Sequence, residues 1–142
     1  MSSDYVARVR ERTQQNLFWR FLGIQVEDAK EGWVRLRVDV RDEIRNAANA
    51  PVHGGVYAAL VDTGVGGALA TVLESAEGGV GQTTVDLNVS FVAGTTAGPI
   101  FAEGRILKRG RTLVFGETTI TDAGGRLLAV GRATYMILAA RG

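Results

Sequence analysis

Apolar and polar residues alternate along several stretches of this sequence, with the two-residue period of half-buried strands. The clearest alternation occurs in residues 33–40 and 83–92, where every second residue is apolar. The same pattern in weaker form predicts four more strands, at residues 23–29, 100–108, 112–121 and 126–138. Glycine-containing turns separate strands that are adjacent in sequence, which predicts hairpins.

Two stretches have the longer period of a helix. In residues 5–22, apolar side chains recur three and four positions apart, and Gly23 provides a stop. A second helix is predicted from Gly54 to about Ser75, apolar on nearly all sides and therefore buried. Helices and strands do not alternate as a parallel βαβ sheet requires. We therefore predict an α+β fold, with a largely antiparallel sheet and one dominant buried helix, in a single domain spanning residues 1–142.

The apolar run in residues 56–73 is long enough to be considered as a membrane span. It contains Asp62 and three glycines, and an unpaired aspartate in hydrocarbon costs a few kcal/mol. We therefore interpret the run as a buried helix of a soluble protein and expect no membrane partner. The first fifteen residues contain no apolar segment typical of a secretory signal, and the chain has no cysteine, so we expect a cytoplasmic location.

Charge and composition exclude several kinds of site. Sixteen Lys and Arg against fifteen Asp and Glu leave a net charge of +1, without the basic excess of a nucleic-acid-binding domain. No nucleic-acid partner is therefore expected. With no cysteine and one histidine, the chain lacks a thiolate nucleophile and a multi-histidine metal site, and we expect neither a metal nor another cofactor. The sheet must cover its edges, which favours a homo-oligomer.

Asp62 is the one charged residue between His53 and Leu73. A carboxylate on an apolar helix costs free energy unless it is paired or serves a chemical purpose. One interpretation is a general base or a nucleophile. The other is a structural carboxylate that bonds to the backbone or pairs with an arginine. The residue type alone leaves both interpretations open.

His53, Gly54 and Gly55 open the long helix, where unpaired amides and the positive end of the helix dipole lie. Because glycines leave these amides unshielded, they can hold a carbonyl oxygen that gains negative charge. The alternative is that the glycines only permit a tight turn. His53 is the sole histidine, and a lone histidine is more often structural than catalytic.

The spacing between the two candidate groups constrains how they act. Gly54 and Asp62 are eight residues apart, which is about 12 Å of rise on one continuous helix. One reacting carbonyl cannot touch both at hydrogen-bond distance. If both act on one substrate, they come from different chains or the helix is broken between them. The spacing therefore favours a site at a homodimer interface.

Two further groups of residues are candidates for binding. Thr83 and Thr84 lie on a predicted strand, where either could orient a water, although strand propensity alone also explains them. Four residues form a basic turn between two predicted strands: Lys108, Arg109, Gly110 and Arg111. Such a turn can meet the phosphates of a small ligand, and the alternative is a solvated surface.

These features together resemble the hotdog-fold acyl-CoA thioesterases. The resemblance rests on PVHGGVYAALVDTGVGGALA, followed by TTVDLNVSF, KRGRTLV and GRATYMIL, and covers residues 16–138. The most similar group is the PaaI-type and 4-hydroxybenzoyl-CoA thioesterase branch. The resemblance implies a long central helix wrapped by a curved antiparallel sheet, and dimers that often pair into tetramers. It also implies metal-free hydrolysis of an acyl-CoA substrate, with an aryl or medium-chain acyl group.

The resemblance also implies roles for individual residues. Asp62 would be the general base or nucleophile, and the amide of Gly54, with support from Gly55, would polarise the thioester carbonyl. Thr84 would place the water, and Gly66 stands where some relatives carry a Thr or Ser one turn after the acid. His53 belongs to the catalytic set as part of the HGG motif, without a proton-transfer role. The remaining assignments are the basic turn for the CoA phosphates, and a substrate-binding set of Thr83, Asn46 and Asn49.

Two other functions fit the same fold. A non-catalytic acyl-CoA binding or sensing protein would need the basic turn and a pocket but not the chemistry of Asp62. An enoyl-thioester hydratase is disfavoured, because that chemistry usually pairs a catalytic histidine with an acid in a different motif.

Overall fold

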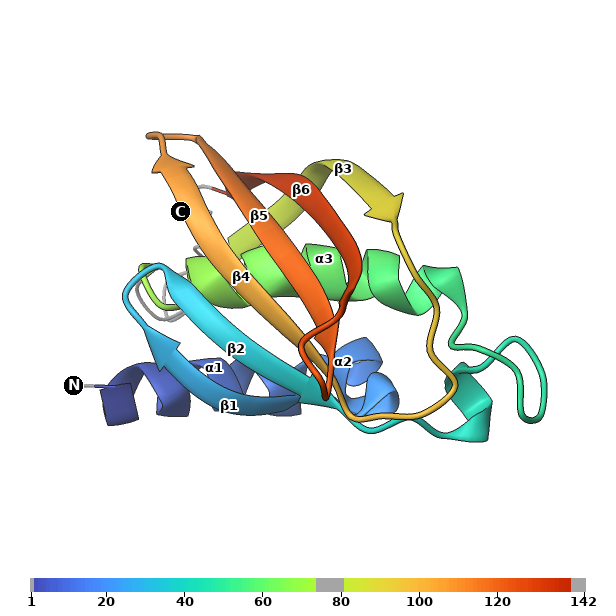
Figure 1. Cartoon of the computed structure of the whole chain (residues 1–142). Coiled ribbons are helices and arrows are strands. Elements are labelled where there is room, and N and C mark those ends of the chain that lie inside the picture. The colour runs from blue at the N-terminus through green and yellow to red at the C-terminus, as the bar shows by residue number, and fades with distance from the viewer. Residues whose placement is uncertain (1, 74–80, 139–142) are drawn as a thin grey trace.

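The computed structural model describes residues 2–73 and 81–138 (Figure 1). Its strands form one antiparallel sheet in the order β1-β2-β4-β5-β6-β3. The strands are β1 (Gln25–Lys30), β2 (Trp33–Val38), β3 (Gly81–Phe91), β4 (Ile100–Arg109), β5 (Leu113–Asp122) and β6 (Leu127–Leu138). The helical elements are α1 (Ser2–Gln15), α2 (Leu17–Leu22), the 3-10 turn η1 (Asp42–Ile44) and α3 (Gly54–Ala70).

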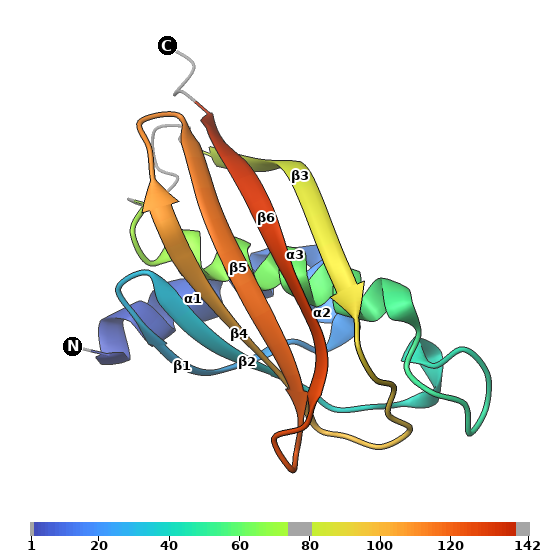
Figure 2. The same cartoon turned by 45° about the horizontal axis from the view of Figure 1, so that its top comes forward.

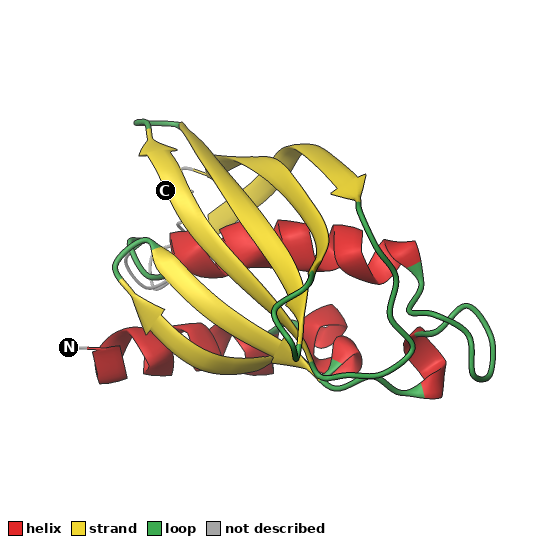
Figure 3. Ribbon diagram, in the orientation of Figure 1, coloured by secondary structure: helices red, strands yellow, loops and turns green. Residues whose placement is uncertain are grey.

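The sheet curves around α3, which crosses its concave face, while α1 lies beside β1 and α3 (Figures 1 and 2). Most side chains of α3 are buried, including Leu60, Val61 and Leu69. Figure 3 shows that helices line one face of the strongly twisted sheet. The α+β prediction, with one buried helix and an antiparallel sheet, is therefore confirmed.

Glycines allow α3 and the sheet to approach closely. A β-carbon on Gly104 of β4 would collide with the backbone of Gly64 on α3. On β5, a β-carbon on Gly116 would lie 2.5 Å from a methyl of Val65. The hydroxyl of Thr118 uses this proximity to donate to the carbonyl of Val61, at 2.9 Å. Gly64 costs helix propensity, and the three glycines permit close packing of α3 on the sheet in return.

The predicted continuous helix over residues 5–22 is wrong, because the chain breaks at Asn16. The Asn16 side chain accepts hydrogen bonds from the amides of Phe18 and Trp19, each at 3.1 Å, and so caps the start of α2. Asparagine favours caps over helix interiors because its side chain competes for backbone amides. Gly23, in the left-handed conformation at φ 73°, ends α2 as predicted.

The six predicted strands all form, with ends that differ by a few residues. The helix predicted to reach Ser75 ends at Ala70 instead. There, the Thr71 hydroxyl donates to the carbonyl of Ala68 at 2.6 Å and accepts from the amide of Gly32 at 2.7 Å. The sequence Glu77-Gly78-Gly79 also predicts a turn before β3, and these residues lie outside the described ones. Within the described parts of the chain, no helix has the length and apolar character needed to cross a membrane.

Candidate active site

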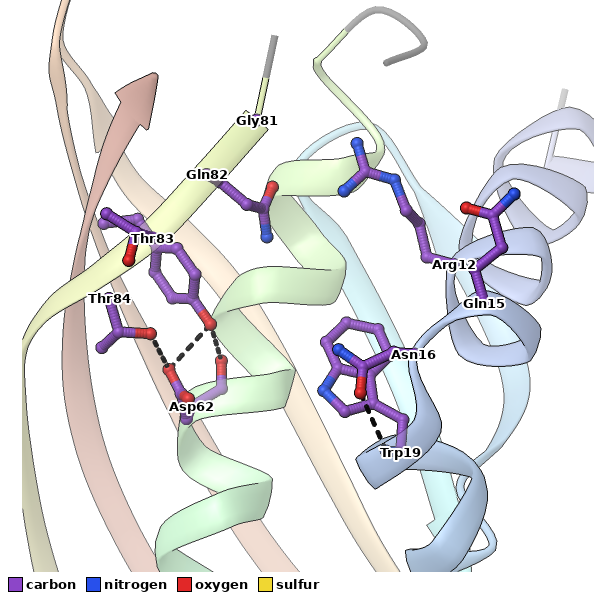
Figure 4. A pocket seen from close by; sticks show the side chains of 10 residues that line it. Arg12, Gln15, Asn16, Trp19, Asp62, Gly81, Gln82, Thr83 and Thr84 are labelled. Atoms are coloured by element: carbon purple, nitrogen blue, oxygen red, sulfur yellow. Dashed lines mark hydrogen bonds between the residues drawn. The ribbon is translucent and has the colours of Figure 1, made fainter. Parts of the chain in front are cut away.

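Asp62 lies near the middle of α3 and turns its carboxylate toward β3 and β6 (Figure 4). Its Oδ1 accepts hydrogen bonds from the hydroxyls of Thr84 on β3 and Tyr135 on β6, both at 2.7 Å. The Tyr135 hydroxyl also lies 2.9 Å from the backbone carbonyl oxygen of Asp62. Asp62 is half-buried. Two neutral donors therefore hold one oxygen of a partly desolvated carboxylate, and neither neutralises its charge.

Tyr135 is buried and remains a neutral donor. Burial raises the pKa of its hydroxyl far above the ordinary value, and the adjacent charge of Asp62 raises it further. Both effects penalise a phenolate beside a carboxylate. Tyr135 therefore donates to Asp62 throughout the neutral pH range.

The carboxylate opens into a pocket of about 480 Å³ (Figure 4). Three predicted residues line it: Asp62, Thr83 and Thr84. The others come from β3, β6 and the two N-terminal helices: Arg12, Gln15, Asn16, Trp19, Gly81, Gln82 and Tyr135. No local pattern marks these residues as pocket-lining, because they meet only when α1, α2 and β6 fold against α3. In the sequence, the alternation of apolar residues along β6 indicates only that Tyr135 lies on the buried face of the strand.

Gln82 sits beside this carboxylate site. Its amide nitrogen donates to the carbonyl of Gly66 at 3.1 Å, and so fixes the side chain against α3. Its Oε1 is buried and accepts no hydrogen bond from the described residues. An amide oxygen in this position can accept a hydrogen bond from a ligand or a water in the pocket.

At the start of α3, His53 is the N-cap residue, and its Nδ1 accepts from the amide of Gly55 at 2.7 Å. The amide of Gly55, expected to support Gly54 as a donor, is therefore already used. The amide of Gly54 makes no hydrogen bond to any other described residue. The amide of Gly54 is thus a donor without an acceptor at this helix end.

A second pocket, of about 380 Å³, adjoins this helix start. Its lining includes His53, Gly55 and Val56 together with Phe18 and Phe21 of α2. Neither His53 nor Gly55 lines the pocket of Asp62, and Asp62 does not line this one. Since α3 is unbroken from Gly54 to Ala70, the premise that the two candidate groups lie about 12 Å apart on one continuous helix is confirmed.

The other predicted site residues lie apart from both pockets. Asn46 and Asn49 are exposed in the loop between η1 and α3, where Asn49 has a φ of 64°. The basic turn forms the exposed connection of β4 to β5, at one end of the sheet (Figure 1). Gly110 is needed there because its β-carbon would lie 2.6 Å from the carbonyl oxygen of Leu113. Within one chain, these residues do not join Asp62.

The side chains within residues 2–73 and 81–138 include no group of three or more His, Cys, Asp or Glu that could hold a metal ion.

The family description "thioesterase superfamily" matches residues 51–129, a segment that contains the start of α3, Asp62 and Thr84. The chain belongs to the thioesterase superfamily. A Halobacterium salinarum protein named "putative esterase" is 29% identical over 96% of this chain and 94% of its own length. A Mycobacterium tuberculosis protein of the same description is 31% identical over 84% of this chain and 85% of its own length.

Solved structures agree with this assignment to the thioesterase superfamily. The structure of the Mycobacterium tuberculosis relative has a TM-score of 0.78 at 30% identity, over 88% of this chain and 98% of that one. The PaaI protein from the phenylacetic acid degradation operon of Escherichia coli has a TM-score of 0.83, over 98% of this chain and 96% of that one. At 17% identity, PaaI shows the fold alone. The predicted hotdog fold of this superfamily is confirmed.

Proposed function

We propose that this protein is an acyl-CoA thioesterase of the PaaI-type and 4-hydroxybenzoyl-CoA thioesterase branch. The observation that carries the proposal is the carboxylate of Asp62, which faces a pocket with Oδ1 held by Thr84 and Tyr135 at 2.7 Å. A carboxylate that is partly desolvated and oriented by neutral donors is suited to general-base or nucleophilic work. Membership of the thioesterase superfamily supports hydrolysis of a thioester in general.

In the proposed reaction, the amide of Gly54 donates to the thioester oxygen as negative charge develops there. With Asp62 as the base, it takes a proton from water while the water oxygen attacks the carbonyl carbon. The carbon–sulfur bond then breaks, and the thiolate of CoA takes up the proton, which leaves the free acid. With Asp62 as the nucleophile, its oxygen attacks the carbonyl carbon, the carbon–sulfur bond breaks and the CoA thiolate leaves. Water then hydrolyses the resulting anhydride to the free acid and the Asp62 carboxylate, and the proton that is released goes to the thiolate.

We further propose that the site forms between two chains. Gly54 and Asp62 lie about 12 Å apart along one continuous helix, and Gly54 does not line the pocket of Asp62, so one substrate reaches both only across an interface. Strand β3 supports such an interface, because it pairs with β6 on one side and is the outermost strand of the described sheet on the other. Its exposed apolar side chains include Val85, Leu87 and Phe91. An open apolar edge strand is a template for pairing with a second copy.

The basic turn is proposed to bind the phosphates of coenzyme A, since Lys108, Arg109 and Arg111 are all exposed there. The acyl group is proposed to be aryl or medium-chain. Metal and cofactor are not required by this mechanism.

The experiment that tests the proposal is thiol release from a panel of CoA esters. The panel contains phenylacetyl-, hydroxybenzoyl- and medium-chain acyl-CoA, and Asp62→Asn is assayed beside the wild type. Asp4→Asn, which removes an exposed carboxylate on α1, serves as the control. We expect turnover by the wild type and the control, and its loss in a folded Asp62→Asn protein. Full turnover by Asp62→Asn would remove Asp62 from the mechanism, and binding of CoA esters without thiol release would indicate a sensing protein.

The shared site is tested separately by mixing two inactive variants. Asp62→Asn lacks the carboxylate, and Gly54→Pro lacks the amide at the start of α3. If each site combines Asp62 of one chain with Gly54 of the other, a heterodimer contains one intact site. Random exchange then restores about a quarter of the wild-type sites. No recovery in exchanged dimers would place both groups of a site in one chain.

A further inference from the structure

The Asp62 carboxylate receives a hydroxyl that does not come from its own helix or from the neighbouring β3. Tyr135 reaches it from β6, and its OH lies 2.7 Å from Oδ1 and 2.9 Å from the backbone carbonyl oxygen of the same residue. The hydroxyl has one proton, so the two contacts share it. Thr84 supplies the second donor to Oδ1 at 2.7 Å. Oδ2 takes no part in these hydrogen bonds.

Gly66 makes this contact possible. It follows Asp62 by one helical turn, where a side chain would lie on the same face of α3 as the carboxylate. A β-carbon at residue 66 would lie 2.6 Å from the Tyr135 hydroxyl and 3.2 Å from the ring carbon that carries it. The tyrosine hydroxyl therefore occupies the space that a side chain at residue 66 would fill.

We propose that Tyr135 is a positioning residue for the reaction of Asp62, and that Gly66 is present to admit its hydroxyl. This inference rests on the proposed thioesterase function. By donating to Oδ1 together with Thr84, Tyr135 fixes the rotation of the carboxylate. Oδ2 is then held in a constant direction for a water or a thioester.

Burial favours this role over simple packing. Tyr135 is 5% exposed, and its hydroxyl is directed at a carboxylate rather than at solvent. A phenylalanine would fill the same apolar space without placing a polar atom in it, so packing alone does not require the hydroxyl. The neutral form of the phenol is the one that burial and the nearby charge stabilise, and only that form donates a proton.

The test compares three variants with the wild type, all checked for folding and oligomeric state. Tyr135→Phe removes the hydroxyl and keeps the ring. Tyr135→Phe/Gly66→Ser returns a hydroxyl from residue 66, one turn from Asp62. Tyr135→Phe/Gly66→Ala adds the same β-carbon without a hydroxyl and is the matched control. Both double variants keep the 3.2 Å contact of the new β-carbon with the ring and with Nε2 of Gln82, so they share any packing strain.

We expect Tyr135→Phe to lower kcat roughly 10–100-fold with little change in KM, since the lost hydrogen bond is to a charged group. The serine double variant should recover part of kcat, and the alanine double variant should not. The inference is overturned if Tyr135→Phe turns over like the wild type, or if the serine and alanine double variants behave alike. If the wild type released no thiol from any CoA ester of the panel, the proposed function would be wrong instead, so the two failures are distinguishable.

Discussion

The imidazole of His53 accepts a hydrogen bond from the amide of Gly55, with 2.7 Å between Nδ1 and the amide nitrogen. An accepting Nδ1 carries no proton, so the imidazole caps the first turn of α3 as an Asn or Asp side chain would. This contact uses the second amide of the helix and leaves the first, that of Gly54, open. We therefore interpret His53 as the residue that caps and orients the start of α3.

We therefore expect His53→Ala to destabilise the protein by about 1 kcal/mol, the usual cost of losing a helix cap. His53→Asn should lose less, because asparagine can accept the same amide. Urea unfolding followed by circular dichroism measures the difference. Equal stability of the two variants would argue against the cap, and equally complete loss of thiol release in both would make His53 a proton-transfer group.

A proline at position 54 would remove the backbone N–H there without disrupting the start of α3. It is the first residue of α3, a position at which proline is well tolerated. His53 before it has φ −62° and ψ 136°, which is the extended conformation that a residue preceding proline prefers. Gly54→Pro should therefore fold and lack only the N–H.

We expect Gly54→Pro to lower kcat by about 10²–10³, the cost of one oxyanion donor. Gly54→Ala keeps the amide, and its β-carbon would lie at an ordinary 3.4 Å from the ring of Phe91, so it serves as the control. The measurement is steady-state thiol release with both variants at equal fold content. A Gly54→Pro protein as active as Gly54→Ala would remove this amide from the mechanism.

Thr83 and Thr84 form a second matched pair. Both line the pocket of Asp62, but only Thr84 donates to its carboxylate. We expect Thr84→Val to lower kcat roughly 10-fold or more, because a hydrogen bond to a charged group is lost, while Thr84→Ser retains most of the activity. Thr83→Val should change KM at most. Equal effects of the two valine substitutions on kcat would contradict the role of Thr84.

The sequence was sufficient to predict α3, because its apolar run and its single carboxylate are local features. It was also sufficient for the six strands, whose alternation is local. The strand pattern left Thr83 and Thr84 as equal candidates, and the resemblance to a family favoured Thr84, which lies 22 residues from its hydrogen-bond partner Asp62. The break at Asn16 was not predicted, since a side chain that caps a helix competes with a continuous apolar pattern around it.

The place of Tyr135 in the site, and of the pocket residues from α1 and α2, does not follow from the sequence pattern. The contact of Tyr135 with Asp62 spans 73 residues, and it depends on which strand lies beside β3 in the sheet. The alternation of β6 predicts which of its residues face the core, but not which core residue each one meets. Arg12 and Trp19 enter the pocket only because α1 and α2 pack across it. Such partners follow from tertiary topology, which a local pattern does not specify.

The close packing of α3 on the sheet gives a stability prediction from two glycines of one helix. A β-carbon on Gly64 would collide with Oγ1 of Thr118 and lie 2.7 Å from its methyl carbon. A β-carbon on Gly67 would lie 3.4 Å or more from the methyls of Val34 and Val9, an ordinary contact. We expect Gly64→Ala to destabilise the protein by about 1–3 kcal/mol through overpacking.

Gly67→Ala should instead be neutral or stabilising by up to about 1 kcal/mol, because alanine has the higher helix propensity. Urea denaturation of both variants measures the two free energies of unfolding. Similar values for the two alanine variants would mean that α3 does not approach the sheet as closely at Gly64 as described.

The basic turn predicts a dependence of KM on the CoA moiety. Replacing Lys108, Arg109 and Arg111 together by glutamine removes three exposed cations, each worth about 0.2–1 kcal/mol against a phosphate. We expect a several-fold higher KM for CoA esters, and no change for the same acyl group on N-acetylcysteamine, which carries no phosphate. Added salt should likewise raise the KM of the wild type for CoA esters, because it screens exposed charges. Lys30→Gln, at an exposed position beside the β1–β2 turn, measures how KM responds to the loss of one cation elsewhere on the surface. An equal rise in KM for both thioesters would contradict a role of the basic turn in CoA recognition.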